Sequence, residues 1–374
     1  MKIPPPSSKV EEWLSCVGID DRSSPPSEPL EIFNRLLKCP EEVVVIGRNA
    51  ESEWISRNYP IRGVLDDFYS GSTWQSRRIL RSEDLRTGDA VINCSSSISP
   101  VSVSRHLDRL GIEHQPYARI AEISGALPIP NFIAQTRKSL ADSFRQWVDL
   151  FETLDDEVSK FQFGAVVAFR LTGDPLYMES FSVRIDEQYM EPFILEPLSC
   201  PFFLDIGGYH GETTLAFCER ITDYGAIRIY EPGQQAAERA EANTQHLEDV
   251  YVVNRGVGES SSWLNFSDDG STAAMFNPNG NTRVRIVPLD EEELHEVDFV
   301  KMDIEGMEIP ALRGARQLIS RDRPFLAIAA YHKGSDPIDI LSEVQNMYDG
   351  YVVRFRHYTE GWSESVLYFC PVSN

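Results

Sequence analysis

The strongest constraint on the fold lies near the end of the chain, where two β-rich segments are separated by only six residues. Residues 351–358 (YVVRFRHY) and 365–371 (SVLYFCP) flank the sequence TEGWSE. A connection this short cannot hold a crossover helix, so the two strands are expected to pair as an antiparallel hairpin. The hairpin must then close a sheet whose other strands lie upstream.

Five further strand candidates precede the hairpin, at 202–208, 226–232, 250–258, 297–306 and 324–332. Helical stretches fill most of the intervals, at 212–220, 233–248, 307–321 and 337–348. Strands that alternate with helices predict a parallel sheet with crossover connections. Residues 200–374 are therefore expected to form an α/β domain with a seven-stranded sheet, the sheet plan of class I methyltransferases.

A second, smaller alternation lies nearer the start of the chain. Its strand candidates are 42–47, 61–67, 89–95 and 112–118, with an amphipathic helix over 102–111. We expect a small Rossmann-like α/β domain over residues 41–122. Residues 1–40, which include Pro/Ser-rich stretches, are expected to form a loosely structured arm with a helix near Leu30–Leu37. Residues 123–199, with helical periodicity over 137–154, are expected to be a helical linker or cap.

The overall charge limits the partners of the chain. Its 35 lysines and arginines stand against 58 aspartates and glutamates, a formal net charge of −23. Such a surface disfavours nucleic acid as a ligand, because cationic side chains supply most of a protein's affinity for a phosphate backbone. Apolar runs such as residues 325–331 are too short to span a bilayer, and the opening residues do not resemble a secretory signal. We expect a cytoplasmic protein without an integral membrane segment; a homo-oligomer is an open alternative.

The small domain has a degenerate phosphate loop. Arg48, Asn49 and Ala50 follow Gly47, where a dinucleotide fingerprint would place further glycines. Asp66 and Asp67 lie about 20 residues on, at the distance of a ribose-binding acid. They are either such acids or turn aspartates that close a strand, and we favour the second interpretation.

A glycine-rich turn, DIGGYHG, follows the first strand of the C-terminal domain. Asp205 lies at the carboxyl end of that strand, where open α/β sheets bind their ligands. Gly207, Gly208 and Gly211 would let the backbone lie against a flat ligand, and Thr213 and Thr214 lie in the first helical turn that follows. The acid disfavours a pyrophosphate and favours a ligand with a cationic amine and sulfonium, as in S-adenosylmethionine.

Glu231 ends the next strand, 20 residues after Gly211. A carboxylate at this point can accept hydrogen bonds from both hydroxyls of a ribose. The alternative is a solvated glutamate before the turn at Pro232, and we favour the ligand interpretation.

A third group of polar residues follows the fourth and fifth strands. Asp303 and Glu305 in KMDIEG could orient a hydroxyl, act as a weak base or hold a divalent metal. Alternatively, Asp303 organises the loop and Glu305 caps the helix that starts near Met307. His332 in AAYHKG is the histidine best placed to act as a general base, although a lone histidine is more often structural.

Five segments in this order resemble the FkbM family of S-adenosylmethionine-dependent methyltransferases. They are FLDIGGYHGETTLAF, IYEP, VDFVKMDIEGMEIPALRGA, PFLAIAAYHK and RHY…VLYF, within residues 200–371. The resemblance implies a class I methyltransferase fold and O-methylation of hydroxyls, commonly on sugars of glycans, lipopolysaccharide or natural products. It also implies cofactor roles for Asp205, Gly207, Gly211 and Glu231, and pocket roles for Asp303, Glu305 and His332.

The sequence therefore predicts methyl transfer to a hydroxyl of a small-molecule or glycan acceptor, with His332 as base and Asp303 orienting the hydroxyl. This interpretation does not depend on a divalent metal, but a metal held by Asp303, Glu305 and His332 is the main mechanistic alternative. Two other function classes stay open. One is an NAD(P)- or nucleotide-sugar-dependent enzyme that uses the first domain, and the other is a non-catalytic, ligand-binding methyltransferase-like module.

Overall fold

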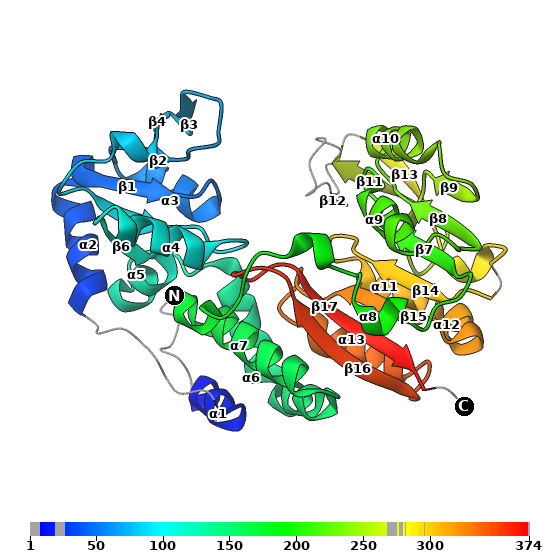
Figure 1. Cartoon of the computed structure of the whole chain (residues 1–374). Coiled ribbons are helices and arrows are strands. Elements are labelled where there is room, and N and C mark those ends of the chain that lie inside the picture. Colours follow the sequence, from blue (N-terminus) through cyan, green and yellow to red (C-terminus); the bar gives the residue numbers. More distant parts are fainter. Residues whose placement is uncertain are drawn as a thin grey trace. The chain divides into compact units, whose positions relative to one another are not determined.

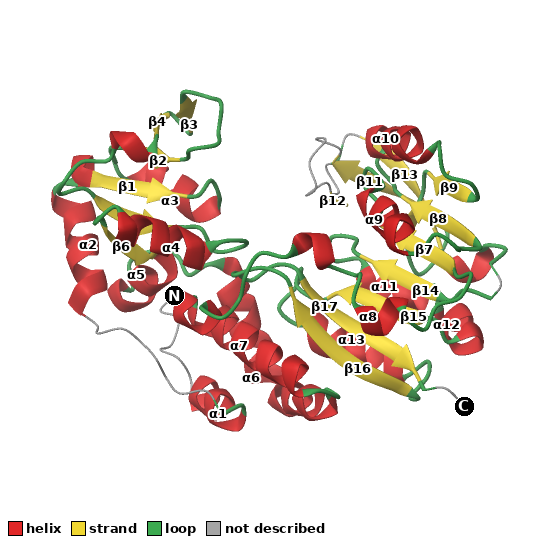
Figure 2. Ribbon diagram, in the orientation of Figure 1, coloured by secondary structure: helices red, strands yellow, loops and turns green. Residues whose placement is uncertain are grey.

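The computed structural model describes residues 8–18, 27–267, 275–276, 280, 282–294 and 296–372 (Figure 1 and Figure 2). The chain forms two compact units. The first comprises the chain up to Arg145 together with Phe161–Val183 and Tyr358–Ser363, and the second comprises Gln146–Lys160, Arg184–His357 and the residues from Glu364. This division differs from the predicted contiguous ranges, because the two helices expected to form a linker and the hairpin turn are divided between the units.

The first unit contains a six-stranded sheet in the order β3-β4-β2-β1-β5-β6. The strands are β1 (Val43–Ile46), β2 (Gly63–Leu65), β3 (Thr73–Trp74), β4 (Arg77–Leu80), β5 (Ala90–Asn93) and β6 (Glu113–Pro116). Neighbouring strands pair in parallel except β3 and β4. This confirms the parallel α/β arrangement predicted for this part of the chain.

Helices cover both faces of this sheet. They are α2 (Ser27–Lys38), α3 (Ala50–Asn58), α4 (Pro100–Arg109) and α5 (Tyr117–Ser124). Buried residues of α2, α3 and α5 share one core with Val43 and Val45, whereas Leu107 of α4 packs on the other face with Val44 and Val91. The alternation of Val43, Val44 and Val45 between the two cores follows from the two-residue period of a strand.

The predicted loose arm is wrong for residues 27–38. Ile32 and Leu36 of α2 are fully buried in the core of the first sheet, because the helix presents its apolar face to the sheet. The predicted helix near Leu30–Leu37 is confirmed as part of α2. Within residues 8–18, α1 (Ser8–Cys16) places Trp13 edge-on to Phe163 at 5.9 Å between ring centroids.

Two long helices, α6 (Asn131–Thr153) and α7 (Glu157–Thr172), confirm the helical periodicity of residues 137–154. Helix α6 is kinked at Ser143, where φ is −138° and ψ is 33°. The short helices η3 (Pro175–Met178), η4 (Ile185–Glu187) and α8 (Pro192–Leu195) follow. None of the described helices is both long enough and apolar enough to cross a membrane.

The second unit contains a seven-stranded sheet in the order β16-β17-β15-β14-β7-β8-β9. Its strands are β7 (Phe202–Ile206), β8 (Ala226–Tyr230), β9 (Val250–Val253), β14 (Phe299–Met302), β15 (Phe325–Ala329), β16 (Tyr351–His357) and β17 (Ser365–Pro371). Strands β7, β8, β9, β14 and β15 are parallel, and β17 lies antiparallel between β15 and β16. The predicted terminal hairpin is confirmed, with Tyr351 opposite Pro371 and His357 opposite Ser365.

Besides η4 and α8, the second unit contains the helices α9 (Glu212–Arg220), α10 (Gln234–Thr244), η5 (Leu289–Glu291), α11 (Glu308–Arg313), α12 (Arg316–Asp322) and α13 (Asp336–Gln345). The single helix expected over 307–321 is two helices, α11 and α12. Between them Gly314 packs so closely that a Cβ atom would lie 2.0 Å from the carbonyl oxygen of Gly258. This close contact accounts for a glycine at the break.

A second small sheet, in the order β10-β13-β11-β12, was not predicted from the sequence. It comprises β10 (Gly256–Val257), β11 (Ser262–Ser267), β12 (Met275–Phe276) and β13 (Thr282–Val287). The segment 250–258, expected to be one strand, is divided between β9 and β10 in different sheets. Asn254 separates the two, and its side-chain amide donates to the carbonyl oxygens of Glu231 and Pro232.

Candidate active site

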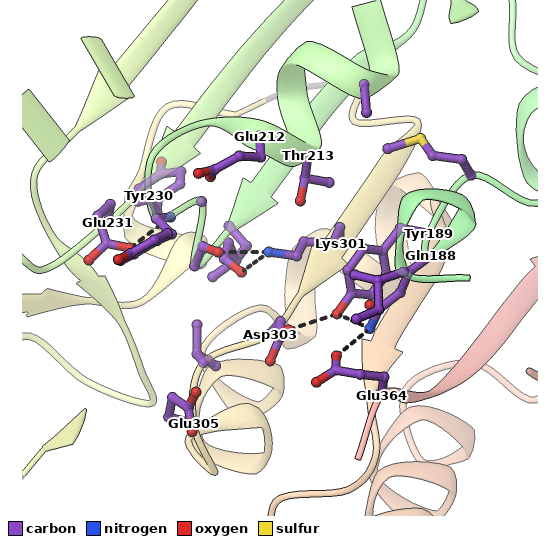
Figure 3. Close-up of a pocket in the computed structure, with 18 of the residues that line it drawn as sticks. Gln188, Tyr189, Glu212, Thr213, Tyr230, Glu231, Lys301, Asp303, Glu305 and Glu364 are labelled. Atoms are coloured by element: carbon purple, nitrogen blue, oxygen red, sulfur yellow. Dashed lines mark hydrogen bonds between the residues drawn. The ribbon is translucent and has the colours of Figure 1, made fainter. Parts of the chain in front are cut away.

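A cavity of about 810 Å³ opens in the second unit, with β7, β8 and β14 ending at its wall (Figure 3). Its volume lies within the range of small-molecule pockets. The predicted site residues that line it are Gly207, Gly208, Thr213, Glu231, Asp303 and Glu305. The other predicted residues, Asp205, Gly211, Thr214 and His332, do not line the cavity. Gly211 is the residue before α9 and has a φ of +85°.

The glycine-rich turn after β7 is fixed by its neighbours. Gly207 has a φ of +80°, and a Cβ atom there would lie 1.9 Å from the carbonyl oxygen of Asp303. At Gly208 a Cβ atom would lie 2.1 Å from Cγ2 of Ile229. The glycines therefore let the turn pack against the ends of β14 and β8, which leaves backbone rather than side chains at this part of the cavity wall.

Asp205 has a structural role that differs from the predicted contact with a ligand. Its side chain is fully buried, Oδ2 accepts a hydrogen bond from Oγ1 of Thr214 at 2.9 Å, and Oδ1 lies 3.1 Å from Nζ of Lys301. Nζ of Lys301 also donates to the carbonyl oxygen of Gly207 at 2.7 Å. The glycine turn is thus supported on the side away from the cavity by the buried contacts of Asp205 with Thr214 and Lys301.

Lys301 is a site residue that the sequence analysis missed. It lies in β14, its side chain is 3% exposed, and it lines the cavity. A lysine within the apolar run VDFVKM was the available signal, because a lysine is seldom buried without a partner.

Glu231 is held at the end of β8 with both carboxylate oxygens engaged. The backbone N–H groups of Tyr209 and Gly233 donate to Oε2 and Oε1 at 2.9 Å and 2.8 Å. Burial raises the pKa of Glu231 to about 7, even though these two backbone hydrogen bonds and Lys301 favour the charged form. Each oxygen keeps a further lone pair, so the carboxylate can accept two hydrogen bonds from a ligand.

Asp303 is fixed by tyrosine hydroxyls. The hydroxyl of Tyr189 donates to Oδ2 at 2.8 Å, and that of Tyr331 lies 3.4 Å from the same oxygen (Figure 3). Tyr189 lies in the segment after η4, in a part of the chain where the sequence showed no site motif. Asp303 is therefore oriented by a residue distant in sequence.

His332 lies behind the cavity wall among three carboxylates. Its Nε2 lies 3.3 Å from Asp303 and 3.6 Å from Glu305, and its Nδ1 lies 3.1 Å from Glu308. Burial alone would lower the pKa of His332, but the contacts with Glu308, Asp303 and Glu305 together raise it to about 9. The ring is therefore a cation at neutral pH.

The side chain of Glu305 is 33% exposed, against 22% for Asp303. Burial, and next the carboxylates of Asp303 and Glu308, raise the pKa of Glu305 to about 7, against the opposing effect of His332. Helix α11 has no side-chain cap, so the capping role predicted for Glu305 is wrong. Glu308 instead holds the loop before α11, because its Oε1 accepts from the backbone N–H of Ile304 at 3.0 Å. Glu305 is thus free of the capping role considered in the sequence analysis.

The carboxylates and His332 do not form a good metal site. Donor atoms of Asp303, Glu308 and His332 lie within 4.8 Å of one another. However, Glu308 faces Nδ1 of His332 whereas Asp303 faces Nε2, and one metal ion binds only one nitrogen of an imidazole. Glu305 also faces Nε2 of His332. The positive charge of the protonated ring already balances the neighbouring carboxylates, and a protonated ring has no lone pair for a metal ion. The mechanism proposed for this site therefore uses no metal.

In the degenerate phosphate loop of the first unit, the polar side chains bond to neighbouring groups of the same unit. Arg48 Nε donates to Asp66 at 2.6 Å, and Asp66 also accepts from the backbone N–H of Phe68. The side chain of Asn49 accepts from the backbone N–H of Ser52 and so caps α3. These contacts favour the interpretation of Asp66 as a turn aspartate; Asp67 likewise accepts from Ser82 at 2.7 Å.

Comparison with known proteins gives a family match for the C-terminal part of the chain and a fold match for nearly all of it. Residues 205–371 match the family described as the methyltransferase FkbM domain. A solved structure of methyltransferase FkbM from Methylobacillus flagellatus KT matches 98% of this chain and 100% of its own length, with 20% identity and a TM-score of 0.72. That match shows the fold of nearly the whole chain.

Two other solved structures match about half of the chain. One is an rRNA methylase from Streptococcus thermophilus, with 14% identity over 48% of this chain and 91% of its own, and a TM-score of 0.33. The other is Aeropyrum pernix fibrillarin with bound S-adenosyl-L-methionine, with 11% identity over 50% and 71%, and a TM-score of 0.33. None of the curated proteins compared with the chain matches it.

Proposed function

On the premise that residues 205–371 match the methyltransferase FkbM domain, we propose that the chain transfers a methyl group from S-adenosylmethionine to a hydroxyl of a small-molecule or glycan acceptor. The observation that carries the proposal is one cavity with two chemically different ends (Figure 3). Glu231 lies at one end, Asp303 and Glu305 lie at the other, and the glycine turn runs between them, with Gly207 against Asp303 and the N–H of Tyr209 on Glu231.

The residues at the first end fit the cofactor. Backbone at Gly207 and Gly208 forms a wall without bulky side chains, and Glu231 offers two oriented oxygens for ribose hydroxyls. The described residues that line the cavity include seven acids but two basic residues, Arg220 and Lys301. Such a lining favours a ligand with a cationic amine and sulfonium over a pyrophosphate.

The cofactor, when bound, supplies an electrophilic methyl group and its own leaving group. The chain's residues must then hold the acceptor hydroxyl in line with that methyl group and take up its proton. Asp303 is suited to orient the hydroxyl, because Tyr189 fixes the position of its carboxylate.

The proton acceptor that we propose is Glu305 rather than His332. A histidine with a pKa of about 9 is protonated at neutral pH and has no lone pair for a further proton. Glu305 lines the cavity, and its pKa of about 7 suits a base that works near neutrality. The hydroxyl proton passes to the Glu305 carboxylate as the new carbon–oxygen bond forms, and the positive charge of His332 holds Asp303 and Glu305 in place.

Calorimetric titration with S-adenosylhomocysteine tests the cofactor end. We expect the wild-type protein to bind it with micromolar affinity and Glu231→Gln to weaken binding at least about tenfold, because an uncharged amide forms weaker hydrogen bonds with ribose hydroxyls. Glu241→Gln, which changes an exposed glutamate on α10, is the matched control and should bind like wild type. A folded wild-type protein that does not bind S-adenosylhomocysteine would overturn the proposal.

A further inference from the structure

One carboxylate at the acceptor end of the cavity has no role in the reaction described above. Glu364 precedes β17, lines the cavity and has a φ of +66°, in the left-handed region that residues other than glycine seldom adopt. Its Oε2 accepts a hydrogen bond from Nε2 of Gln188 at 3.0 Å. In Figure 3 Gln188, Tyr189 and Glu364 lie on the side of the cavity opposite Glu231.

Glu364 and Asp303 are held by one hydrogen-bonded chain. Gln188, which is 6% exposed, donates from Nε2 both to Glu364 and to the hydroxyl oxygen of Tyr189 at 3.0 Å. The Tyr189 hydroxyl in turn donates to Asp303 at 2.8 Å. Two carboxylates are thus fixed beside the same space, and their orientation does not depend on mobile surface side chains.

No basic residue that lines the cavity is available to neutralise Glu364 among the described residues. Lys301 is paired with Asp205, and Arg220 donates to the backbone carbonyl oxygens of Ala216 and Asp186. Burial, and next the charge of Asp303, raise the pKa of Glu364, although hydrogen bonds from Gln188 and Tyr331 and the positive charge of His332 behind the cavity wall act in the opposite direction. A ligand that brings a positive charge to this place would stabilise both carboxylates.

Taking the proposed methyl transfer as its basis, we propose that Glu364 is a specificity-determining residue that binds an ammonium group of the acceptor. The preferred acceptors would then be hydroxyl compounds that also carry an amine, such as amino sugars. An ammonium group has three N–H donors, so it can bond Glu364 and a second acceptor such as Asp303 at once. A phosphate or carboxylate at this position would be repelled by both carboxylates.

Matched sugars test the charge preference on the protein loaded with S-adenosylhomocysteine. The probes are D-glucosamine, its neutral counterpart N-acetyl-D-glucosamine, and glucosamine 6-phosphate, with binding measured by ligand-observed NMR titration. We expect glucosamine to bind at least about tenfold more tightly than the N-acetyl sugar, a factor equal to about 1.4 kcal/mol. The phosphorylated sugar should bind more weakly than glucosamine.

Two variants assign the preference to a residue. Glu364→Gln keeps the size of the side chain and should remove most of the preference for glucosamine over N-acetyl-D-glucosamine, because only the Asp303 carboxylate is then left beside the ammonium group. Glu219→Gln removes another carboxylate that lines the cavity, an exposed one on α9, and should keep the preference.

The outcomes separate this proposal from the proposed function. If the wild-type protein binds S-adenosylhomocysteine but not glucosamine, or binds both sugars equally, the role of Glu364 is refuted and the methyl transfer stands. If the preference persists in Glu364→Gln, the ammonium is recognised elsewhere and the role of Glu364 is again refuted. Loss of S-adenosylhomocysteine binding in the wild type would instead refute the proposed function.

Discussion

Nζ of Lys301 lies 3.1 Å from Oδ1 of Asp205, and the two side chains are 3% and 0% exposed. This buried ion pair joins β14 to β7 directly beneath the glycine turn, whose carbonyl oxygen at Gly207 also accepts from Lys301. The same two strands carry residues at the cofactor end and the acceptor end of the cavity. The pair therefore links the stability of the domain to the shape of its site.

Lys301→Met should destabilise the protein strongly, by about 3–5 kcal/mol, because it leaves the Asp205 carboxylate buried without its cation. The measurement is the free energy of unfolding in urea. Arg313→Gln, which breaks a pair with Glu343 through a side chain that is 45% exposed, is the control and should change stability little. Equal effects of the two changes would contradict the role assigned to Lys301.

The affinity for S-adenosylhomocysteine should rise with pH through about 7. Glu231 has a pKa of about 7, so its carboxylate is mostly protonated at pH 6 and mostly ionised at pH 8. The ionised form is the stronger acceptor at both oxygens, and it carries no O–H that competes for the ribose hydroxyls, so the affinity should increase up to about tenfold over this interval. Calorimetry at the two pH values measures the change.

Glu231→Gln is the reference for that experiment. Its affinity should be lower than that of wild type at pH 8 and should vary less between pH 6 and pH 8, because the amide does not titrate. A pH dependence that persists unchanged in this variant would assign the titration to another group.

The fold could be predicted from the sequence because its signals are local. Apolar runs that alternate with helical stretches define the parallel strands, and the six residues between 351–358 and 365–371 force the hairpin. The small sheet of β10–β13 gave no such signal. Its division from β9 depends on the contacts of Asn254 with the turn after β8, which are tertiary.

The site could be predicted only where its residues follow strands. Glu231, Asp303 and Glu305 line the cavity because the carboxyl ends of parallel strands meet at one edge. Gln188 and Glu364 belong to segments without motifs, and only packing brings them to this edge. The sequence also could not predict that the pKa of His332 is raised, because the shift results from the carboxylates that the fold places around the ring.

The pH dependence of methyl transfer should distinguish the two candidate bases. With Glu305 as base, kcat should rise with pH to a plateau with an inflection near pH 7, because its carboxyl must lose a proton. With His332 as base, the inflection would lie near pH 9. The measurement is kcat between pH 5.5 and pH 9.5 at saturating cofactor and acceptor.

Glu305→Gln should lower kcat by roughly 10²–10⁴-fold and leave the affinity for S-adenosylhomocysteine unchanged.

His332→Gln should move the acid limb of the profile to higher pH, because the positive charge of His332 lowers the pKa of Glu305. An acid limb that stays in place in the His332 variant would show that the histidine does not act on this carboxylate.

Tyr189→Phe should lower kcat about tenfold or more, because it removes a hydrogen bond to a charged group, an interaction worth about 1.5–3 kcal/mol. The variant keeps the ring, and its affinity for S-adenosylhomocysteine should match wild type because the lost hydroxyl faces Asp303. Tyr331→Phe is the matched comparison: its hydroxyl lies 3.4 Å and 3.5 Å from the Asp303 oxygens, so its loss should reduce kcat less. Steady-state kinetics on both variants checks the order. A larger loss in Tyr331→Phe would mean that Asp303 is positioned from the loop after β15 rather than from the segment of Tyr189.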